Sequence, residues 1–269
     1  MDNQKKAIGV FDSGVGGLTV VREIMKQLPK EDIIYFGDTA RVPYGTKSKD
    51  TIIKFSIENV RFLLKFDVKV IVVACNTASS ISLPSLRFHF NVPIIGVIRP
   101  GAREAVRVTK NKRVGVIGTK TTIASRAYED EIKYHDKTIR IMSKACPLFV
   151  PLAEEGWIRK KITREIAKTY LTPIKKQKVD TLILGCTHYP LLKGVIKQIM
   201  GDGINLVDSA HQTAREVSRL FLEKGLLNTS AGRPRYEFYV SDEPENFINI
   251  GKKFLGKSLK HVERVKEDV

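Results

Sequence analysis

Two stretches of the sequence share one plan: residues 70–79, VIVVACNTAS, and residues 181–190, TLILGCTHYP. In each, an apolar run ends at Ala or Gly, a cysteine follows, and a threonine comes within two residues of that cysteine. An apolar run of this kind is typical of a parallel strand that is buried on both faces. Loops at the carboxyl ends of such strands are where α/β proteins bind ligands. We therefore expect the loops of Cys75 and Cys186 to lie on opposite sides of one small molecule.

Short apolar strands alternate with helical segments along the whole chain. The predicted strands cover residues 6–11, 32–36, 70–74, 93–98, 114–117, 138–143, 181–184, 205–207 and 236–240, with a last strand near Val262. The predicted helices include residues 49–65, 102–108, 123–134, 162–174 and 247–254. This alternation predicts an α/β fold with mainly parallel sheets.

The second half of the chain repeats the order of elements of the first. Asp12, at the end of one strand, precedes Cys75 by 63 residues, and Thr119, after another strand, precedes Cys186 by 67 residues. This near-equality suggests an internal duplication. We expect two pseudo-symmetric three-layer α/β domains with the active site in the cleft between them. Residues 1–98 plus 208–269 would form the lobe of Asp12 and Cys75, and residues 99–207 the lobe of Thr119 and Cys186.

The composition narrows the class of protein. The formal charge of +17, from 46 basic and 29 acidic residues, could serve nucleic-acid binding, but the basic residues are dispersed and form no nucleic-acid motif. We expect a lysine-rich solvated surface instead. No apolar run reaches the ~18 residues of a membrane span, and the N-terminus does not resemble a signal peptide. Three cysteines do not suggest a disulfide framework, so we expect a cytoplasmic protein with reduced thiols.

A glycine loop follows the first strand. It reads Asp12-Ser13-Gly14-Val15-Gly16-Gly17, and a helix comes after it. This layout forms an anion cradle of backbone N–H groups at a helix N-terminus. Dinucleotide binding is not expected, because Thr19 replaces the third glycine of the G-x-G-x-x-G fingerprint. Asp12 and Ser13, polar residues at the end of a strand, favour a ligand site over a bare turn.

Two thiols on opposite faces of a carbon atom suit proton transfer with inversion. One cysteine takes a proton as a thiolate while the other, still a thiol, donates one to the opposite face. A free cysteine has a pKa of about 8.5, so a small shift gives usable thiolate near neutral pH. His188 lies two residues from Cys186 and can assist it. Asp12 is a candidate proton relay for Cys75 if their strands are neighbours.

These residues also allow other interpretations. We expect Cys146 to be a small buried residue, and His188 could also be structural. Cysteine, histidine and aspartate are zinc ligands, but Cys186-Thr187-His188 lacks the spacing of a zinc site, so we expect no metal. A cysteine–histidine hydrolase would use one nucleophile and leave the second cysteine unexplained.

Six motifs occur between Ile8 and Leu192: IGVFDSGVGGLTVVREI, GDTARVPYG, VVACNTAS, PIIGVIRPGA, ACPLFVPLAEEG and LILGCTHYPLL. The resemblance that they indicate runs from about Ile8 to Arg264, over nearly the whole chain. In these motifs the chain resembles the bacterial glutamate racemases, which are cofactor-independent amino-acid racemases. Related aspartate racemases usually carry Glu where this chain has His188, which favours glutamate. The resemblance implies interconversion of L- and D-glutamate without pyridoxal phosphate or another cofactor. It also implies supply of D-glutamate for peptidoglycan, and a homodimer.

The resemblance assigns roles at matching positions. Cys75 is expected to take the proton from the D-isomer and Cys186 from the L-isomer, with Asp12, Glu154 and His188 as assisting acid–base groups. The positions that match those holding the amino acid are Asp12, Ser13, Tyr44, Gly45, Asn76, Thr77, Thr119, Thr122, Thr187 and His188. Thr121 departs from the pattern, because many relatives carry Gly there. An aspartate racemase and a non-catalytic module that binds acidic amino acids are the alternatives.

Overall fold

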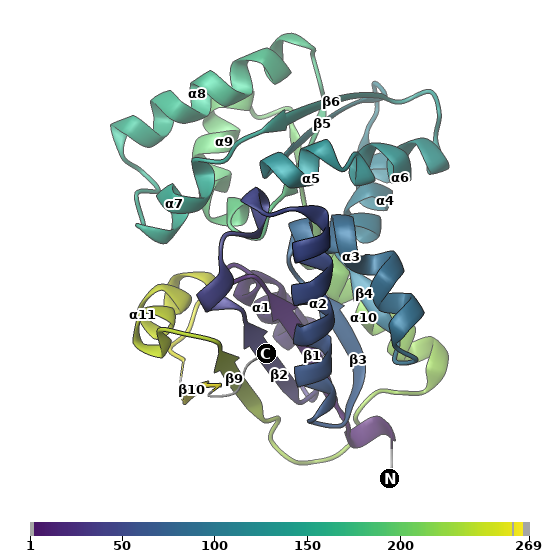
Figure 1. The fold of residues 1–269 in the computed structure, drawn as a ribbon. Helices are drawn as coiled ribbons and strands as arrows, with labels where there is room; N and C mark the ends of the chain where they lie inside the picture. Colours follow the sequence, from purple (N-terminus) through teal and green to yellow (C-terminus); the bar gives the residue numbers. More distant parts are fainter. Residues whose placement is uncertain (1–2, 260, 266–269) are drawn as a thin grey trace.

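The protein consists of two lobes, each built around a parallel sheet (Figure 1). The computed structural model describes residues 3–259 and 261–265. The strands of the first sheet are β1 (Ala7–Asp12), β2 (Ile33–Gly37), β3 (Val68–Val73), β4 (Ile94–Gly96), β9 (Tyr236–Val240) and β10 (Val262–Arg264). Those of the second are β5 (Arg113–Gly118), β6 (Arg140–Ala145), β7 (Thr181–Gly185) and β8 (Asn205–Asp208).

The two sheets share one strand order. The first runs β10-β9-β2-β1-β3-β4 and the second β6-β5-β7-β8. The four strands β2-β1-β3-β4 therefore correspond, in chain order, to β6-β5-β7-β8, which supports an internal duplication. β9 pairs with β2, so the C-terminal segment returns to the first lobe and extends its sheet. We propose lobe boundaries at residues 98/99 and 207/208.

Helices cover both faces of the first sheet, because its central strands are apolar on both sides. All six residues of β1 and all six of β3 are buried. Ile8 and Val70 face a core formed with α1 (Leu18–Gln27), α10 (Ser209–Lys224) and α11 (Pro244–Leu255). Phe11 and Ile71 face a second core, formed with α2 (Lys49–Leu64) and α3 (Asn76–His89).

The second lobe is layered in the same way. Leu182 and Leu184 of β7 face a core formed with α7 (Phe149–Glu154), α8 (Lys161–Lys176) and α9 (Lys193–Met200). Ile183, which points to the opposite face of the same strand, packs with α4 (Ile98–Val108) and α6 (Ala127–His135). Each lobe thus has three layers, with a sheet between two layers of helices.

Two predicted elements differ from the structure. The helix expected over residues 123–134 is divided into α5 (Lys120–Ala124) and α6, because Arg126 adopts a left-handed conformation with φ of 59°. The Ser125 hydroxyl replaces helical bonds at this break, donating to the Thr122 carbonyl and accepting from the Ala127 N–H. The strand expected over 93–98 is shorter, because Ile98 already begins α4.

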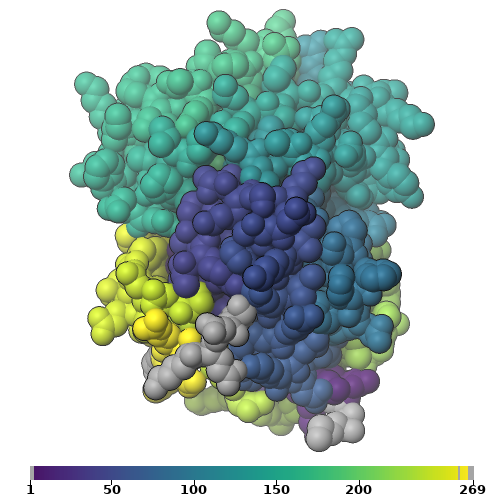
Figure 2. Space-filling view, in the orientation of Figure 1, coloured from purple at the N-terminus to yellow at the C-terminus, as the bar shows by residue number. Residues whose placement is uncertain are grey.

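The chain crosses between the lobes twice, from β4 into α4 and from β8 into α10. α10 contacts both α1 and α4. Figure 2 shows one face of the molecule, on which the teal atoms of the second lobe lie directly against the purple-blue atoms of the first. Short 3₁₀ turns at Asn3–Lys5, Thr39–Arg41, Tyr44–Thr46 and Tyr189–Leu192 complete the described structure. Every helix in the described ranges is too short or too polar to span a membrane.

Candidate active site

The loops that follow the central strands of both sheets meet between the lobes. β1 pairs with β3, which places Asp12 beside the loop of Cys75. β5 pairs with β7, which places Thr119 beside the loop of Cys186. The two loop pairs face each other, since the hydroxyl oxygen of Thr77 lies 3.0 Å from that of Thr119. The structure therefore brings both cysteine loops into one interlobe site.

Cys75 precedes the first turn of α3, and its sulfur accepts a hydrogen bond from the Ala78 N–H at 3.5 Å. The sulfur also lies 3.6 Å from Ser13 Oγ. Burial first, and then the nearby Asp12 carboxylate and Cys186, together raise the pKa of Cys75 to about 12. Both effects disfavour negative charge on the sulfur. Cys75 is therefore a neutral thiol at neutral pH and can donate a proton.

Cys186 lies in a different electrostatic environment. Its sulfur is 3.7 Å from Nδ1 of His188, whose Nε2 is 2.8 Å from Oε1 of Glu154. Burial alone would lower the pKa of His188, but its contacts with Cys186 and Glu154 outweigh burial and raise this pKa to about 10. His188 is thus an imidazolium at neutral pH. A cation at this distance stabilises negative charge on the Cys186 sulfur.

The sulfurs of Cys75 and Cys186 therefore lie in different electrostatic surroundings. Cys75 is a thiol that holds its proton, and the sulfur of Cys186 lies beside the imidazolium of His188. Cys75, Cys146 and Cys186 are all free and buried. This asymmetry suits one group that accepts a proton and one that donates it.

Two buried polar atoms of the site lack a hydrogen-bond partner within the described chain: Asp12 Oδ1 and Asn76 Nδ2. The other oxygen of Asp12 accepts from the Gly14 N–H at 3.0 Å. The Asn76 oxygen accepts from the Tyr128 hydroxyl at 2.7 Å, which directs the amide nitrogen elsewhere. Buried polar atoms are usually paired, so an unpaired acceptor and an unpaired donor among the residues of the site point to a ligand. An amino acid supplies the complement, an ammonium donor and a carboxylate acceptor.

Three threonine hydroxyls gather where the lobes meet. Those of Thr77 and Thr122 are 3.2 Å apart, and those of Thr119 and Thr122 are 2.9 Å apart. Thr119 also caps α5, because its hydroxyl accepts from the Thr122 N–H. Thr187, next to Cys186, is buried as well. Hydroxyl groups can donate to a carboxylate without a fixed positive charge.

Tyr44 is placed differently from the other candidate residues, because its side chain points into the first lobe. Its ring is buried, and its hydroxyl donates to the Asp38 carboxylate and accepts from the Asn59 amide. Gly45, the next residue, faces the second lobe. A Cβ atom at Gly45 would lie 2.9 Å from the Cβ of Thr119. The groups that Tyr44 and Gly45 present to the interlobe site are therefore backbone groups.

Three residues at this contact were not among the predicted site residues. The Thr19 hydroxyl donates to the Thr187 carbonyl at 3.2 Å and so joins the lobes. Tyr128 orients Asn76 across the same boundary. Gly16 packs against Thr187 so closely that a Cβ there would lie 2.2 Å from the Thr187 hydroxyl oxygen. In the sequence, only the glycine loop of residues 12–17 indicated that any of these three residues would lie near the site.

Gly16→Ala is expected to lower kcat/KM by about 10²-fold, since a displacement of about 1 Å at a catalytic site has that effect. The added methyl group would also lie 2.6 Å from His188 Nδ1, so the lobes cannot close without moving His188. Steady-state kinetics and thermal unfolding of the variant check this. Gly194→Ala is the matched control, because its Cβ meets no atom within 4 Å. Wild-type values of kcat and KM for Gly16→Ala would show that the close packing of Gly16 against Thr187 and His188 is not needed for activity.

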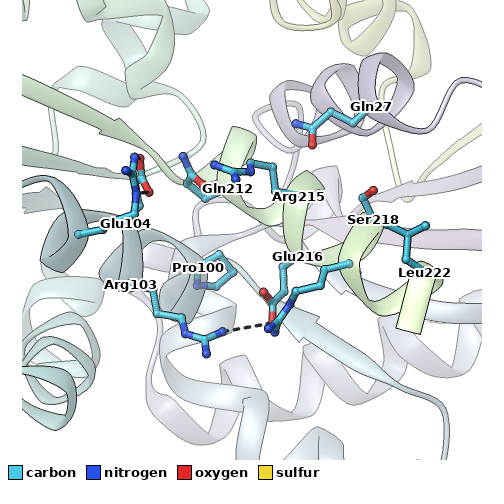
Figure 3. A pocket seen from close by; sticks show the side chains of 11 residues that line it. Gln27, Pro100, Arg103, Glu104, Gln212, Arg215, Glu216, Ser218 and Leu222 are labelled. Atoms are coloured by element: carbon cyan, nitrogen blue, oxygen red, sulfur yellow. Dashed lines mark hydrogen bonds and ion pairs between the residues drawn. The ribbon is translucent and has the colours of Figure 1, made fainter. Parts of the chain in front are cut away.

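A separate surface pocket of about 680 Å³ lies between α1, α4 and α10 (Figure 3). Arginine and glutamate side chains dominate its lining, and Arg103 pairs with Glu216 across it at 3.6 Å. It shares no residue with the interlobe site.

Two similar α/β lobes, each contributing a cysteine loop to a buried site between them, define the architecture of an amino-acid racemase, which is a class of isomerase. The sequence profile of the Asp/Glu/Hydantoin racemase family matches residues 8–217. The chain is 52% identical over 260 residues to a glutamate racemase from Geobacter metallireducens, covering 97% of this chain and 96% of the relative.

Solved structures agree with the sequence comparison. A glutamate racemase isoform from Bacillus anthracis superposes with a TM-score of 0.94 at 42% identity, covering 98% of both chains. The glutamate racemase from Francisella tularensis, solved with D-glutamate, gives a TM-score of 0.92 at 42% identity and covers 98% of both chains. The chain belongs to the bacterial glutamate racemases of the Asp/Glu racemase family, and it is an isomerase.

Proposed function

We propose that the protein interconverts L- and D-glutamate by proton transfer at Cα between two cysteines, without a cofactor, and so supplies D-glutamate for peptidoglycan. The observation that supports this most directly is the pair of buried cysteine loops, one from each lobe, with Cys75 a thiol and Cys186 beside an imidazolium. The Francisella relative, whose structure contains D-glutamate, supports the choice of substrate.

In the L-to-D direction the Cys186 thiolate takes the Cα proton and becomes a thiol. The resulting carbanion is stabilised by delocalisation into the α-carboxylate. The Cys75 thiol then gives its proton to the opposite face of Cα and becomes a thiolate. The D-to-L direction reverses these steps, so that Cys75 takes the proton from the D-isomer.

Asp12, Glu154 and His188 assist this exchange in different ways. Burial raises the pKa of the Asp12 carboxyl, with His188 acting in the opposite sense, and this suits Asp12 to pass a proton to and from Cys75. His188 balances the charge on Cys186, and Glu154 holds His188 in place through Nε2. The ion pair at Nε2 leaves Nδ1 directed at the sulfur.

The substrate is held by the polar groups already described. Asp12 and Asn76 offer the unpaired acceptor and donor, and the hydroxyls of Thr77, Thr119, Thr122 and Thr187 offer further bonds to the carboxylates. Ser13 and the backbone of Tyr44 and Gly45 complete the set. The reaction takes a small molecule only, so we expect no nucleic-acid or membrane partner, and we expect a cytoplasmic homodimer.

Incubating the protein with L-glutamate in D₂O, with no cofactor added, is expected to yield D-glutamate that carries deuterium at Cα. The label enters because the thiol that donates the proton exchanges with solvent. Chiral chromatography and mass spectrometry measure both the inversion and the label. Unlabelled D-glutamate would argue against solvent-exchanging thiols as the two bases.

The alternatives predict different results in the same assay. An aspartate racemase would invert L-aspartate faster than L-glutamate. A non-catalytic binding module would bind glutamate in calorimetry but leave its configuration unchanged. Faster turnover of glutamate than of aspartate supports the proposed substrate.

A further inference from the structure

The loop that carries Tyr44 and Gly45 is anchored from the first lobe by a buried ionic cluster. The fully buried Asp38 carboxylate accepts from Arg41 Nε, with 2.8 Å to each oxygen, and from the Tyr44 hydroxyl. Ser241, at the end of β9, donates to the same carboxylate at 3.1 Å. The Tyr44 ring therefore cannot turn toward the second lobe without breaking these bonds.

The same loop is held from the second lobe by one hydrogen bond. The hydroxyl of Thr121, in the first turn of α5, donates to the Gly45 carbonyl oxygen at 2.9 Å. Gly45 lies within the 3₁₀ turn Tyr44–Thr46, and this turn presents its carbonyl oxygen to Thr121. Gly45 lies between a residue anchored in the first lobe and a hydroxyl of the second.

We propose that Thr121 is a positioning residue, which fastens the Tyr44–Gly45 loop to the second lobe when the lobes close over the amino acid. This proposal rests on the proposed glutamate racemisation. Thr121 touches neither cysteine in any described contact, so it acts through the loop and not on the reacting carbon.

Thr121→Val keeps the shape of the side chain and removes the hydroxyl. A neutral hydrogen bond contributes a factor of about five to a binding equilibrium. The bond is present in the closed state both before and during proton transfer, so its loss weakens ground state and transition state alike. We expect KM to rise about fivefold in both directions with kcat nearly unchanged.

Three other variants make this test specific. Thr121→Ser retains a hydroxyl and is expected to keep KM within about twofold of wild type, whereas Thr121→Gly should resemble Thr121→Val. Thr169→Val is the matched control, because Thr169 is an exposed residue of α8 whose hydroxyl bonds within its own helix. A wild-type KM in Thr121→Val, or equal effects of Val and Ser, would overturn the proposal.

Hydrogen exchange gives a second readout that does not depend on turnover. With glutamate bound, the amides of residues 44–47 should exchange more slowly in the wild type than in Thr121→Val, and the two should match without glutamate. Equal exchange in the bound proteins would also overturn the proposal. The proposed function fails separately, if the wild-type protein does not invert glutamate, and the positioning role then falls with it.

Discussion

Replacing either Cys75 or Cys186 by alanine is expected to lower the rate of racemisation by at least about 10²–10⁴-fold, the contribution of one positioned acid or base. Neither remaining thiol can reach both faces of Cα. Each variant should lose both directions of the reaction. Because L- and D-glutamate have equal free energy, kcat/KM must fall by the same factor for the two enantiomers.

Each single variant should still remove and return the Cα proton on one face of the amino acid. Incorporation of deuterium from D₂O measures this exchange. Cys75→Ala keeps the Cys186–His188 pair, so in D₂O it should slowly exchange the Cα proton of L-glutamate without inverting it. Cys186→Ala should show the converse preference for D-glutamate. Nuclear magnetic resonance of the recovered amino acid measures the exchange, and chiral chromatography measures the inversion.

Cys146→Ala is the control for these variants. Cys146 is as buried as the other two cysteines, but its thiol bonds to the Lys144 carbonyl at 3.6 Å and faces the core beneath α7. Its substitution should leave kcat/KM within about threefold of wild type while costing about 1 kcal/mol of stability. Racemisation at a rate near wild type in Cys75→Ala or Cys186→Ala would end the two-base mechanism.

Local sequence patterns were sufficient to predict two lobes with mainly parallel sheets and to select Asp12, Cys75, Cys186 and His188 as candidates for the site. A buried parallel strand has a recognisable composition, and a polar residue directly after it must lie at the carboxyl edge of the sheet. The similar spacings, 63 residues from Asp12 to Cys75 and 67 from Thr119 to Cys186, also suggested the internal duplication that the repeated strand order supports. These inferences depend only on neighbours along the chain or on adjacent strands.

The contacts between the lobes could not be predicted in this way. The bond from Thr19 to Thr187 joins residues 168 positions apart, and that from Tyr128 to Asn76 joins residues 52 apart. Neither residue type nor spacing signals such a pair. The direction of the Tyr44 side chain was likewise hidden, because it is set by Asp38 in the interior of the first lobe. The left-handed Arg126 divided a segment whose pattern predicted one continuous helix.

The charge states of the site also depend on the fold. The sequence placed His188 near Cys186, but the pKa of His188 is raised by Glu154 as well as by Cys186. Glu154 lies 34 residues earlier and approaches His188 because α7 packs beside the Cys186 loop. The same applies to Cys75, whose pKa rises through burial and through Asp12 on the neighbouring strand. A motif alone specifies neither effect.

Glu154→Gln is expected to move the alkaline limit of activity to lower pH. The His188 pKa of about 10 means that the imidazolium persists from neutral pH up to that value and is lost above it. The wild-type kcat/KM should therefore hold through neutral pH and fall as pH rises through about 10. Removing the Glu154 charge lowers the pKa of His188 by about 1–3 units, so the fall should begin correspondingly earlier.

The size of the effect should depend on pH, which separates it from a general loss of structure. Near pH 6.5 the imidazole of Glu154→Gln is still largely protonated, and its kcat/KM should approach that of wild type. At pH 9 the loss should lie between about twofold, if the pKa of His188 falls by one unit, and about 90-fold, if it falls by three units. Glu155→Gln, at an exposed neighbouring position, should retain the wild-type profile.

His188→Asn should abolish the alkaline limb altogether, because the titrating group is gone, and should lower kcat/KM by about 10²-fold across the pH range. A profile of Glu154→Gln that parallels the wild type at every pH would show that Glu154 does not control the proton of His188. The ion pair between His188 and Glu154 would then not explain how Cys186 accepts a proton. The proposed roles of Cys186 as proton acceptor and Cys75 as proton donor would have to be revised.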